Sequence, residues 1–591
     1  METKMLFASV ICILCLACSP SSYRDGQIQY EKVQLSPESK LIVHESLKGM
    51  HEKYDPEVKM IMKKLSGYNY HTDASNGLFH EVRASFSYAV LLMDLGEEQF
   101  RERAFEVIAK TITLQDQDTT SKSCGVWPYY MEEPLATKKS PIDFNWADFN
   151  AVSLLDVWMG HRDQIPAELK PAIKNALVLA ARSIEKRNMG PGYTNIAIMG
   201  TYVTYMVAHL FDLPDMKSYA NARLKKFYDY TLDKGGFSEY NSPTYTIVAL
   251  DELFRMKSHI VEPAARQQID SLYSIGWDII AKHYHQPTGQ WAGPHSRSYS
   301  TLVKPSFYAI LKEGSNGKID VGIEEKRSDT KIKHQIPDYL MHYFVAPIYP
   351  RTVTDRFEKE APQTIGTCYL APDFALSTVN CSSLWNQRRP FLVYWGSVTN
   401  PKYLQVRFLH DDYDFSSASF YGQQKDNKVL AGINFITNGG DKHISIDRLK
   451  EGKFVAKDLR LRFEFGNTDL KDLALPVGVF DPFSLNLEGL VFNFQLFTAT
   501  FGNLKGHWEK GSNGKSAWMD FVFYNGAESE FDLTRLNKAL VGFTFSLTNQ
   551  EVKPVNPQPD CQENEQLMKV NWNGLTLELP VKPQAPKKWF L

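Results

Sequence analysis

The spacing of apolar residues changes near the middle of this 591-residue chain, and this change constrains its fold class more than any other feature. From about residue 40 to 300 apolar residues recur at helical spacing, most clearly in 80–95 and 194–210. After about residue 335 the period becomes two, as in 459–465 (LRLRFEF) and 541–547 (VGFTFSL). A chain of this length is also too long for one hydrophobic core. The pattern therefore predicts an all-α domain followed by an antiparallel all-β domain.

Domain boundaries follow from this change and from the segments at either end. Residues 313–333 are charged, contain glycine and are poor in apolar residues, which is typical of a linker. The expected division is a signal peptide at 1–17, a tether at 18–40, a helical domain at 41–312, a linker at 313–337 and a β-sandwich domain at 338–591. Within the last domain, 569–579 (KVNWNGLTLEL) predicts a hairpin that turns at Asn573-Gly574.

The N-terminus has the features of an export signal. Residues 1–17 have a short basic start and an apolar run of about a dozen residues, too short for a permanent membrane span. The segment Leu16-Ala17-Cys18, followed by Ser-Pro-Ser-Ser, resembles a bacterial lipoprotein processing site, although Cys15 stands where leucine is usual. We therefore expect a lipid on Cys18 that anchors the protein to a membrane facing the periplasm or the cell surface. A secretory signal without lipid is the alternative.

Composition and motifs limit the partners and cofactors. The chain has 66 lysine and arginine residues and 68 aspartate and glutamate residues. This near-neutral balance gives no reason to expect nucleic acid as a partner. The sequence has no GxGxxG or GxxxxGK[ST] segment, so no nucleotide cofactor is expected. Residues 410–414 (HDDYD) contain metal-ligand types, but alternation along a strand would send neighbouring side chains to opposite faces. We expect no metal cofactor, and a structural calcium or zinc ion at 410–414 is the alternative. Cys368 and Cys381 could form a disulfide or remain as buried thiols.

Polar and aromatic residues gather in five clusters near the starts of the predicted helices. The clusters are 80–88, 145–150, 192–195, 239–245 and 294–299. The last four are spaced by roughly 45 to 55 residues, the length of a helical hairpin with its loops. If the apolar helices that follow them run parallel as an inner ring, all five clusters meet at one rim. Helix N-termini at that rim would favour an anionic ligand. The repeat predicts an (α/α) toroid with its site on the rim.

This architecture resembles the polysaccharide lyases of the heparinase II/III, alginate lyase and chondroitin lyase type. The segments EYNSPTY (239–245), GPHSRSY (293–299) and WNQRRP (385–390) are similar in kind to segments of such proteins. The resemblance implies β-elimination on a uronic-acid-containing glycan, with an acidic polysaccharide as partner and a monomer or small homo-oligomer as the assembly. A glycoside hydrolase that uses Asp148 and Glu239 as a carboxylate pair is the first alternative. A non-catalytic glycan-binding lipoprotein is the second.

Elimination requires a group that neutralises the uronate, a base and an acid, and the clusters contain each type. A tyrosine base also needs a nearby cation such as Arg297. The candidate catalytic residues are His295, Tyr245, Tyr240 and Tyr299. The candidate substrate-binding residues are Asn241, Asn195, Arg297, Arg83, His80, Trp127, Asp148, Asn150, Glu239 and Arg388. Several have structural alternatives: 241–243 could start a helix, and Trp127 could anchor a loop.

Overall fold

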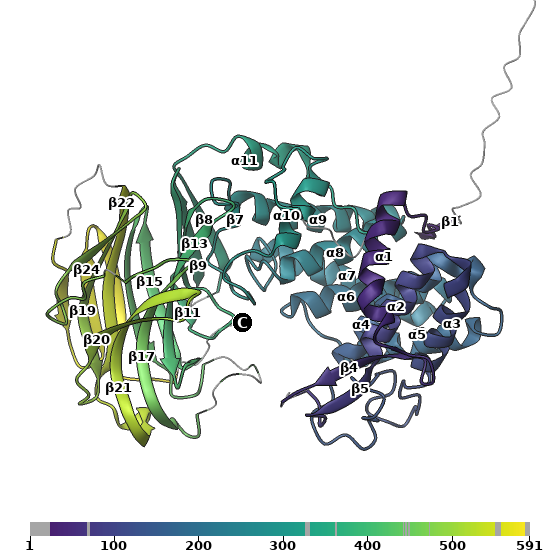
Figure 1. The fold of residues 1–591 in the computed structure, drawn as a ribbon, viewed down its shortest axis with the longest axis horizontal. Helices are drawn as coiled ribbons and strands as arrows, with labels where there is room; N and C mark the ends of the chain where they lie inside the picture. Colours follow the sequence, from purple (N-terminus) through teal and green to yellow (C-terminus); the bar gives the residue numbers. More distant parts are fainter. Residues whose placement is uncertain are drawn as a thin grey trace, which may run out of the picture.

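The protein consists of a helical domain followed by a domain of antiparallel sheets (Figure 1). A computed structural model describes residues 24–585 except 68–70, 325–330, 361–362, 441–442, 444–445, 447–448, 472 and 550–556. The predicted signal peptide and Cys18 lie outside the described residues. The predicted fold class, α followed by antiparallel β, is confirmed.

The helices begin and end at residues that local chemistry favours. They are α1 (Pro37–His51), α2 (Val82–Leu95), α3 (Glu98–Ile112), α4 (Asn145–His161), α5 (Lys170–Arg187), α6 (Thr194–Leu210), α7 (Pro214–Lys234), α8 (Tyr245–His259), α9 (Pro263–His283), α10 (Pro305–Gly314) and α11 (His342–Val345). Ser36 caps α1 by accepting a hydrogen bond from the Ser39 amide, and α7 starts at Pro214. Asn188 and Gly235 end α5 and α7 in the left-handed conformation.

Alternate helices form an inner ring. Helices α2, α4, α6 and α8 contact one another in this order, and each packs against the helix that follows it, which lies outside the ring. In α6 the residues from Thr194 to His209 are all buried, as expected for a helix that is apolar on most faces. Antiparallel helix pairs arranged in this way form the (α/α) toroid that the sequence predicts.

The segment assigned to a linker packs against the helices in its described part. Ile332 is 2 % exposed, and Ile336, Leu340 and Phe344 belong to the same hydrophobic core as the helix ring. The helical core therefore extends to about residue 345, beyond the boundary expected at residue 312. The β domain begins with the strand at Arg351–Glu358.

In the described residues of the β domain, the strands form three sheets. The first joins β8 (Arg351–Glu358), β9 (Thr364–Leu370), β10 (Phe374–Val379), β12 (Phe391–Gly396), β13 (Pro401–His410), β14 (Tyr413–Asp414), β17 (Lys453–Gly466), β20 (His507–Ser512) and β21 (Ser516–Asp532). The second joins β11 (Cys381–Ser383), β15 (Ala418–Lys425), β16 (Lys428–Phe435), β18 (Phe483–Leu487), β19 (Leu490–Phe501) and β22 (Ala539–Asn549). The third joins β23 (Asp560–Glu563), β24 (Leu567–Trp572) and β25 (Leu575–Pro580).

These sheets are stacked in layers. A phenylalanine-rich core lies between the first and second sheets, and a smaller core joins the second sheet to the third. The predicted hairpin is confirmed as β24 and β25, whose turn places Asn573 at φ 48° and Gly574 at φ 75°. Positive φ at both positions is what a two-residue type I′ turn requires.

Short strand pairs complete the helical domain. They are β1 (Arg24–Asp25) with β2 (Ile28–Gln29), β3 (Tyr54–Asp55) with β4 (Met60–Leu65) and β5 (Gly77–Glu81), and β6 (Tyr284–His285) with β7 (Gln290–Trp291). The loop that follows β7 contacts the β domain, because His295 and Arg389 exchange backbone hydrogen bonds. Nearby, the Tyr240 ring stacks on Phe357 of β8 with ring centroids 3.8 Å apart. These contacts hold the second domain beside the rim of the helix ring (Figure 1).

Candidate active site

A cavity of about 730 Å³ lies at the N-terminal ends of the inner helices. Its wall includes one first-turn residue from each: Arg83 of α2, Asn145 of α4, Asn195 of α6 and Tyr245 of α8. His443 of the β domain also lines it. Because helix N-termini carry unpaired N–H groups and partial positive charge, their convergence suits an anionic ligand.

Arg297 organises one side of this cavity. It lies in the loop between β7 and α10 and donates to the Tyr245 hydroxyl (3.0 Å), the Glu239 carboxylate (3.0 Å) and the Gln387 side-chain oxygen (2.8 Å). Its guanidinium also lies 4.8 Å from the centre of the Tyr245 ring and 5.0 Å from that of Trp385. The predicted motifs at 239–245, 293–299 and 385–390 therefore meet at one cation.

Two tyrosines form a hydrogen-bonded pair beside Arg297. The hydroxyl oxygens of Tyr245 and Tyr299 are 2.6 Å apart. Tyr245 is 8 % exposed, whereas Tyr299 is 57 % exposed, so Tyr299 is the member of the pair that a ligand can reach. Burial raises the pKa of the Tyr245 phenol, against the opposing effect of Arg297. Tyr245 is thus a buried hydrogen-bond partner of Tyr299, and Arg297 is a positive charge close to this pair.

Glu239 is buried behind Arg297 and does not line the cavity. Burial raises its pKa to about 7, although Arg297 and the backbone amides of Asn195 and Thr194 favour the charged form. Its second oxygen has no hydrogen bond among the described residues. The carboxyl group therefore positions Arg297 and does not itself face a ligand.

Asn241 and Ser242 join the two principal motifs. Asn241 has φ 42°, and its amide donates to the carbonyl oxygens of Ala292 (2.9 Å) and Pro294 (3.0 Å). Ser242 lies just before α8, where it accepts from the Tyr245 amide (3.0 Å) and donates to the Arg297 carbonyl (2.6 Å). The helix begins at Tyr245 with Thr244 as its N-cap, two residues later than a helix start with Ser242 as N-cap would place it. The Asn241 side chain is 1 % exposed and outside the cavity.

Of the sequence candidates, Arg83, Asn195, Tyr245, Arg297 and Tyr299 line the cavity. His295 does not: it is 1 % exposed, its Nδ1 lies 2.6 Å from the Asn241 carbonyl oxygen, and burial lowers its pKa to about 3. Tyr240 and Arg388 lie together at the domain interface, where burial raises the pKa of Tyr240 to about 12.

The remaining candidates are engaged elsewhere in the helical domain. His80 contacts Glu132 and Asp55. Trp127 is 1 % exposed and donates to the Thr111 carbonyl oxygen, which makes it a loop anchor. The Asn150 amide donates to the Trp146 carbonyl oxygen. Asp148 is 2 % exposed, and burial raises its pKa to about 7. The Asp148 and Glu239 pair on which the hydrolase alternative rests is therefore not on the cavity wall.

Other residues of the cavity were not singled out from the sequence. The polar ones outside the five sequence clusters are His71, Asp94, Asp143, Ser153, Asp156, Arg187, Asp251, Glu252, Arg255, Lys331 and His443. Asn145 and Tyr193 also line the cavity, and they belong to the clusters at 145–150 and 192–195 that the sequence predicts to meet at the rim. His71 stands alone in a loop, stacked on Tyr129, and Lys331 falls in the segment assigned to a linker. Neither His71 nor Lys331 belongs to a local sequence pattern that would identify it as a cavity residue.

The candidate metal ligands and the candidate disulfide cysteines have other contacts in the structure. Within the described residues, no group of three or more His, Cys, Asp or Glu is placed to hold a metal ion. In the 410–414 segment, His410 lies 2.7 Å from the Val455 carbonyl oxygen and Asp414 pairs with Arg407. Cys368 and Cys381 are both free thiols. No helix in the described part of the chain is long and apolar enough to cross a membrane.

The fold is similar to several solved structures of polysaccharide lyases, the class that the sequence resembles. Heparinase III is 10% identical, with 93% of this chain and 92% of that chain covered at a TM-score of 0.47. The Streptomyces coelicolor A3 chondroitin AC lyase in complex with chondroitin sulphate is 9% identical (92% and 85% covered, TM-score 0.48). The heparan sulfate lyase HepC from Pedobacter heparinus is 8% identical (94% and 90%, TM-score 0.37).

Among curated proteins, none matches this sequence. A family model described as a domain of unknown function (DUF8769) matches residues 40–345, a range that ends where the helical core ends. The chain therefore belongs to the DUF8769 family.

Proposed function

We propose that this protein is a polysaccharide lyase that cleaves a uronic-acid-containing glycan by β-elimination in the rim cavity. One observation carries the proposal: an accessible tyrosine, Tyr299, is hydrogen-bonded to Tyr245 beside Arg297, in a cavity where four helix N-termini meet. The cavity wall carries five cations and five carboxylates: Arg83, Arg187, Arg255, Arg297 and Lys331 against Asp94, Asp143, Asp156, Asp251 and Glu252. The positive potential that an acidic sugar requires therefore comes from the helix N-termini and, locally, from Arg83.

The uronate carboxylate would bind near Arg83 and Asn195. Arg83 is exposed in the cavity and has no hydrogen bond or ion pair with any described residue, and Asn195 lies in the first turn of α6. The proton next to a carboxylate becomes acidic only when the carboxylate charge is neutralised, because the carbanion would otherwise add a second negative charge. A cation and an amide at the helix N-termini provide this neutralisation.

Tyr299 is then the group that exchanges the proton. As a phenolate it would accept a hydrogen bond from Tyr245 and would lie near the positive charge of Arg297. It takes the proton next to the carboxylate, the C–H electron pair forms the new carbon–carbon double bond, and the bond to the leaving oxygen breaks. Tyr299, now protonated, returns the proton to that oxygen, so no proton is gained or lost overall.

The reaction is tested by incubating the purified protein with acidic glycans and following the ultraviolet absorbance of an unsaturated uronic product. We expect absorbance to rise with the number of cleaved bonds. New reducing ends without absorbance would indicate hydrolysis instead, and binding without cleavage would indicate a glycan-binding protein.

Tyr299→Phe should lower kcat by about 10²-fold or more, because it removes the group that transfers the proton. Tyr245→Phe should also slow turnover, since the phenolate would lose its hydrogen-bond donor. Tyr339→Phe is a matched control, because Tyr339 is 62 % exposed and outside the cavity. Full activity in Tyr299→Phe would exclude this role for Tyr299.

A further inference from the structure

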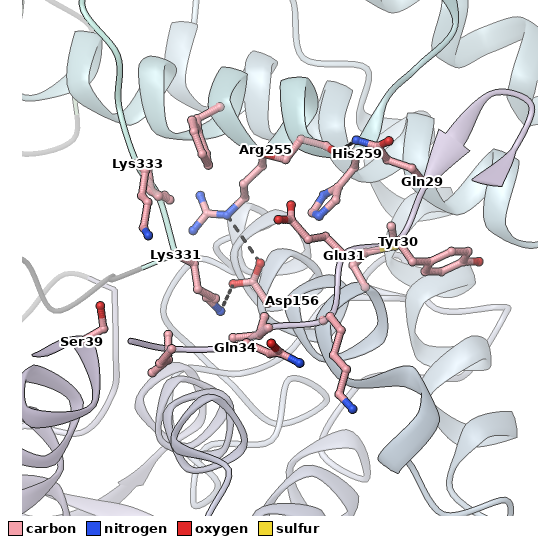
Figure 2. Close-up of a pocket in the computed structure, with 18 of the residues that line it drawn as sticks. Gln29, Tyr30, Glu31, Gln34, Ser39, Asp156, Arg255, His259, Lys331 and Lys333 are labelled. Carbon is pink, nitrogen blue, oxygen red and sulfur yellow. Dashed lines mark hydrogen bonds and ion pairs between the residues drawn. The ribbon is translucent and has the colours of Figure 1, made fainter. Parts of the chain in front are cut away.

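A second cavity, of about 620 Å³, lies at the opposite ends of the inner helices (Figure 2). Its wall includes the C-terminal residues Gly160 of α4 and Ser258 of α8, together with the segment 29–36. That segment crosses from one helix to the other, because the Gln29 side chain donates to the Ser258 carbonyl (2.6 Å) and the Val33 amide to that of Gly160 (3.2 Å). We call this the back cavity and the one at the rim the front cavity.

The two cavities share a wall of charged side chains. Asp156, Arg255 and Lys331 line both cavities. The Asp156 carboxylate lies 3.6 Å from the Arg255 Nε atom and 3.4 Å from the Lys331 Nζ atom, and Figure 2 shows it between the two cations. Whatever binds beside these cations on one side therefore acts on the electrostatic potential of the other.

The back cavity is more positive than negative. Its wall carries four cations, Lys32, Arg255, Lys331 and Lys333, against the two anions Glu31 and Asp156. The C-terminal ends of α4 and α8 add about half a negative charge each, which leaves an excess of about one positive charge. Arg255 and Lys331 are also paired with Glu252 and Asp94, so the unpaired positive charge is that of Lys32 and Lys333. Figure 2 shows Lys331 and Lys333 on the same side of the cavity as Arg255. Lys32 and Lys333 are exposed, and neither has a hydrogen bond or ion pair with any described residue. An anion could bind them without displacing an existing partner.

The rest of the wall suits a polyhydroxylated ligand. Gln34 and Ser39 place an amide and a hydroxyl on the cavity wall, groups that pair with sugar hydroxyls. The volume is within the range of cavities that hold small molecules, about 300 to 1,000 Å³. The segment 29–36 leaves a cavity of this size at the end of the ring and does not fill it.

We propose that the back cavity is a second binding site, for a small anionic sugar whose carboxylate or sulfate group pairs with Lys32, Lys333 and the cations of the shared wall. An anion bound there offsets part of the positive potential that Arg255 and Lys331 contribute to the front cavity. Binding in the two cavities is therefore antagonistic, and the effect is reciprocal. The site stands on its own lining residues and requires no reaction in the front cavity.

The test is a calorimetric titration of the full chain with glucuronic acid at low ionic strength, with glucose 6-sulfate as the sulfated probe and glucose as the neutral one. We expect the wild type to bind two molecules of an anionic probe. Because the sites are antagonistic, the second molecule should bind about five-fold or more weakly than one molecule binds to a variant in which only one of the two sites is intact. The probe that binds more tightly identifies the preferred anionic group. Glucose should bind neither site measurably.

The variants separate the sites. Lys32→Ala with Lys333→Ala should remove one binding event, or weaken it at least ten-fold, and leave the other. Arg83→Ala should weaken binding in the front cavity, which the double variant retains, because Arg83 lines only the front cavity. Lys569→Ala, an exposed lysine of β24, is the control that leaves both events intact.

The proposal would be overturned if the double variant kept both binding events at wild-type affinity, or if Arg83→Ala lost all binding. It would also be overturned if neither anionic probe bound to the wild type. Equal affinities in the wild type and in both variants would overturn the antagonism. Failure of the lyase reaction alone leaves these titrations unchanged, so the two proposals fail separately.

Discussion

Burial decides what each polar residue near the rim can do. His295 and Tyr299 are four positions apart in one motif, yet one is 1 % and the other 57 % exposed. In the sequence both are candidate catalytic residues, because histidine and tyrosine can each transfer a proton. Their difference arises because the loop from Gly293 to Tyr299 is held by Asn241 and Ser242, which bond to its carbonyl oxygens.

Asp148 provides a prediction of pH-dependent stability. Its ordinary pKa of 3.8 is raised to about 7 in the folded protein, because burial disfavours the carboxylate. The folded state therefore holds the proton more tightly than the unfolded state, and stability falls as pH rises from about 4 to 7, by about 3–4 kcal/mol. Asp148→Asn should remove this dependence and be more stable than the wild type at pH 8.

The measurement is urea unfolding at pH 5 and pH 8, followed by circular dichroism. Asp163→Asn serves as a control, because Asp163 is exposed in the turn after α4 and should leave the pH dependence unchanged. An unchanged slope in Asp148→Asn would assign the pH dependence to other groups.

The packing of α6 limits the side chains that this helix can carry. A Cβ atom on Gly200 would lie 2.7 Å from an Asp148 oxygen and 2.9 Å from both an Arg223 nitrogen and an Ile184 methyl group. Alanine favours the helix by about 1 kcal/mol over glycine. The clash costs about 1–3 kcal/mol in a packed core, so Gly200→Ala should be neutral to destabilising, although alanine is the better helix former.

Denaturant midpoints would check this prediction. Gly190→Ala is the matched control, since no atom lies within 4 Å of its Cβ position and its φ is not positive. A clear gain in stability for Gly200→Ala would mean that α6 can shift away from its neighbours.

At the scale of the whole molecule, the domain interface should couple the unfolding of the two domains. Tyr240 stacks on Phe357, and His285 Nε2 lies 2.8 Å from the Ala371 carbonyl oxygen across the same interface. Calorimetry should therefore give one transition for the wild type. Phe357→Ala should lower its temperature or split it, because the stack contributes about 0.5–1.5 kcal/mol beyond buried area.

Phe480→Ala is the control for this experiment, because Phe480 is 48 % exposed in a loop of the β domain. Two well-separated transitions in the wild type would show that the interface does not couple the domains.

The membrane anchor is a separate prediction for the whole chain. If Cys18 carries a lipid, the protein expressed in a bacterium will sediment with membranes, and Cys18→Ser will release it or block its processing. Cys561→Ser is the control, as Cys561 is an exposed thiol far along the chain. Equal partitioning of the wild type and Cys18→Ser would favour a secretory signal without lipid.

The sequence by itself determined the local structure. The shift from helical spacing to a period of two separates the domains, and Asn573-Gly574 defines a hairpin, because these features act through neighbouring residues. The arrangement of rim residues was predictable in part, since four of the five clusters lie at the starts of α2, α4, α6 and α8, and these inner helices run parallel. The fifth, 294–299, lies in the loop before α10.

Only the tertiary structure decided which of those side chains meet. Arg297 touches Glu239, Tyr245 and Gln387, and Lys331 reaches Asp156 from a segment that looks like a linker. Such contacts join residues 52 to 175 positions apart and depend on how whole helices and loops pack, which no local pattern encodes. The change of period predicts two domains, whereas the packing of 293–299 between them creates the site.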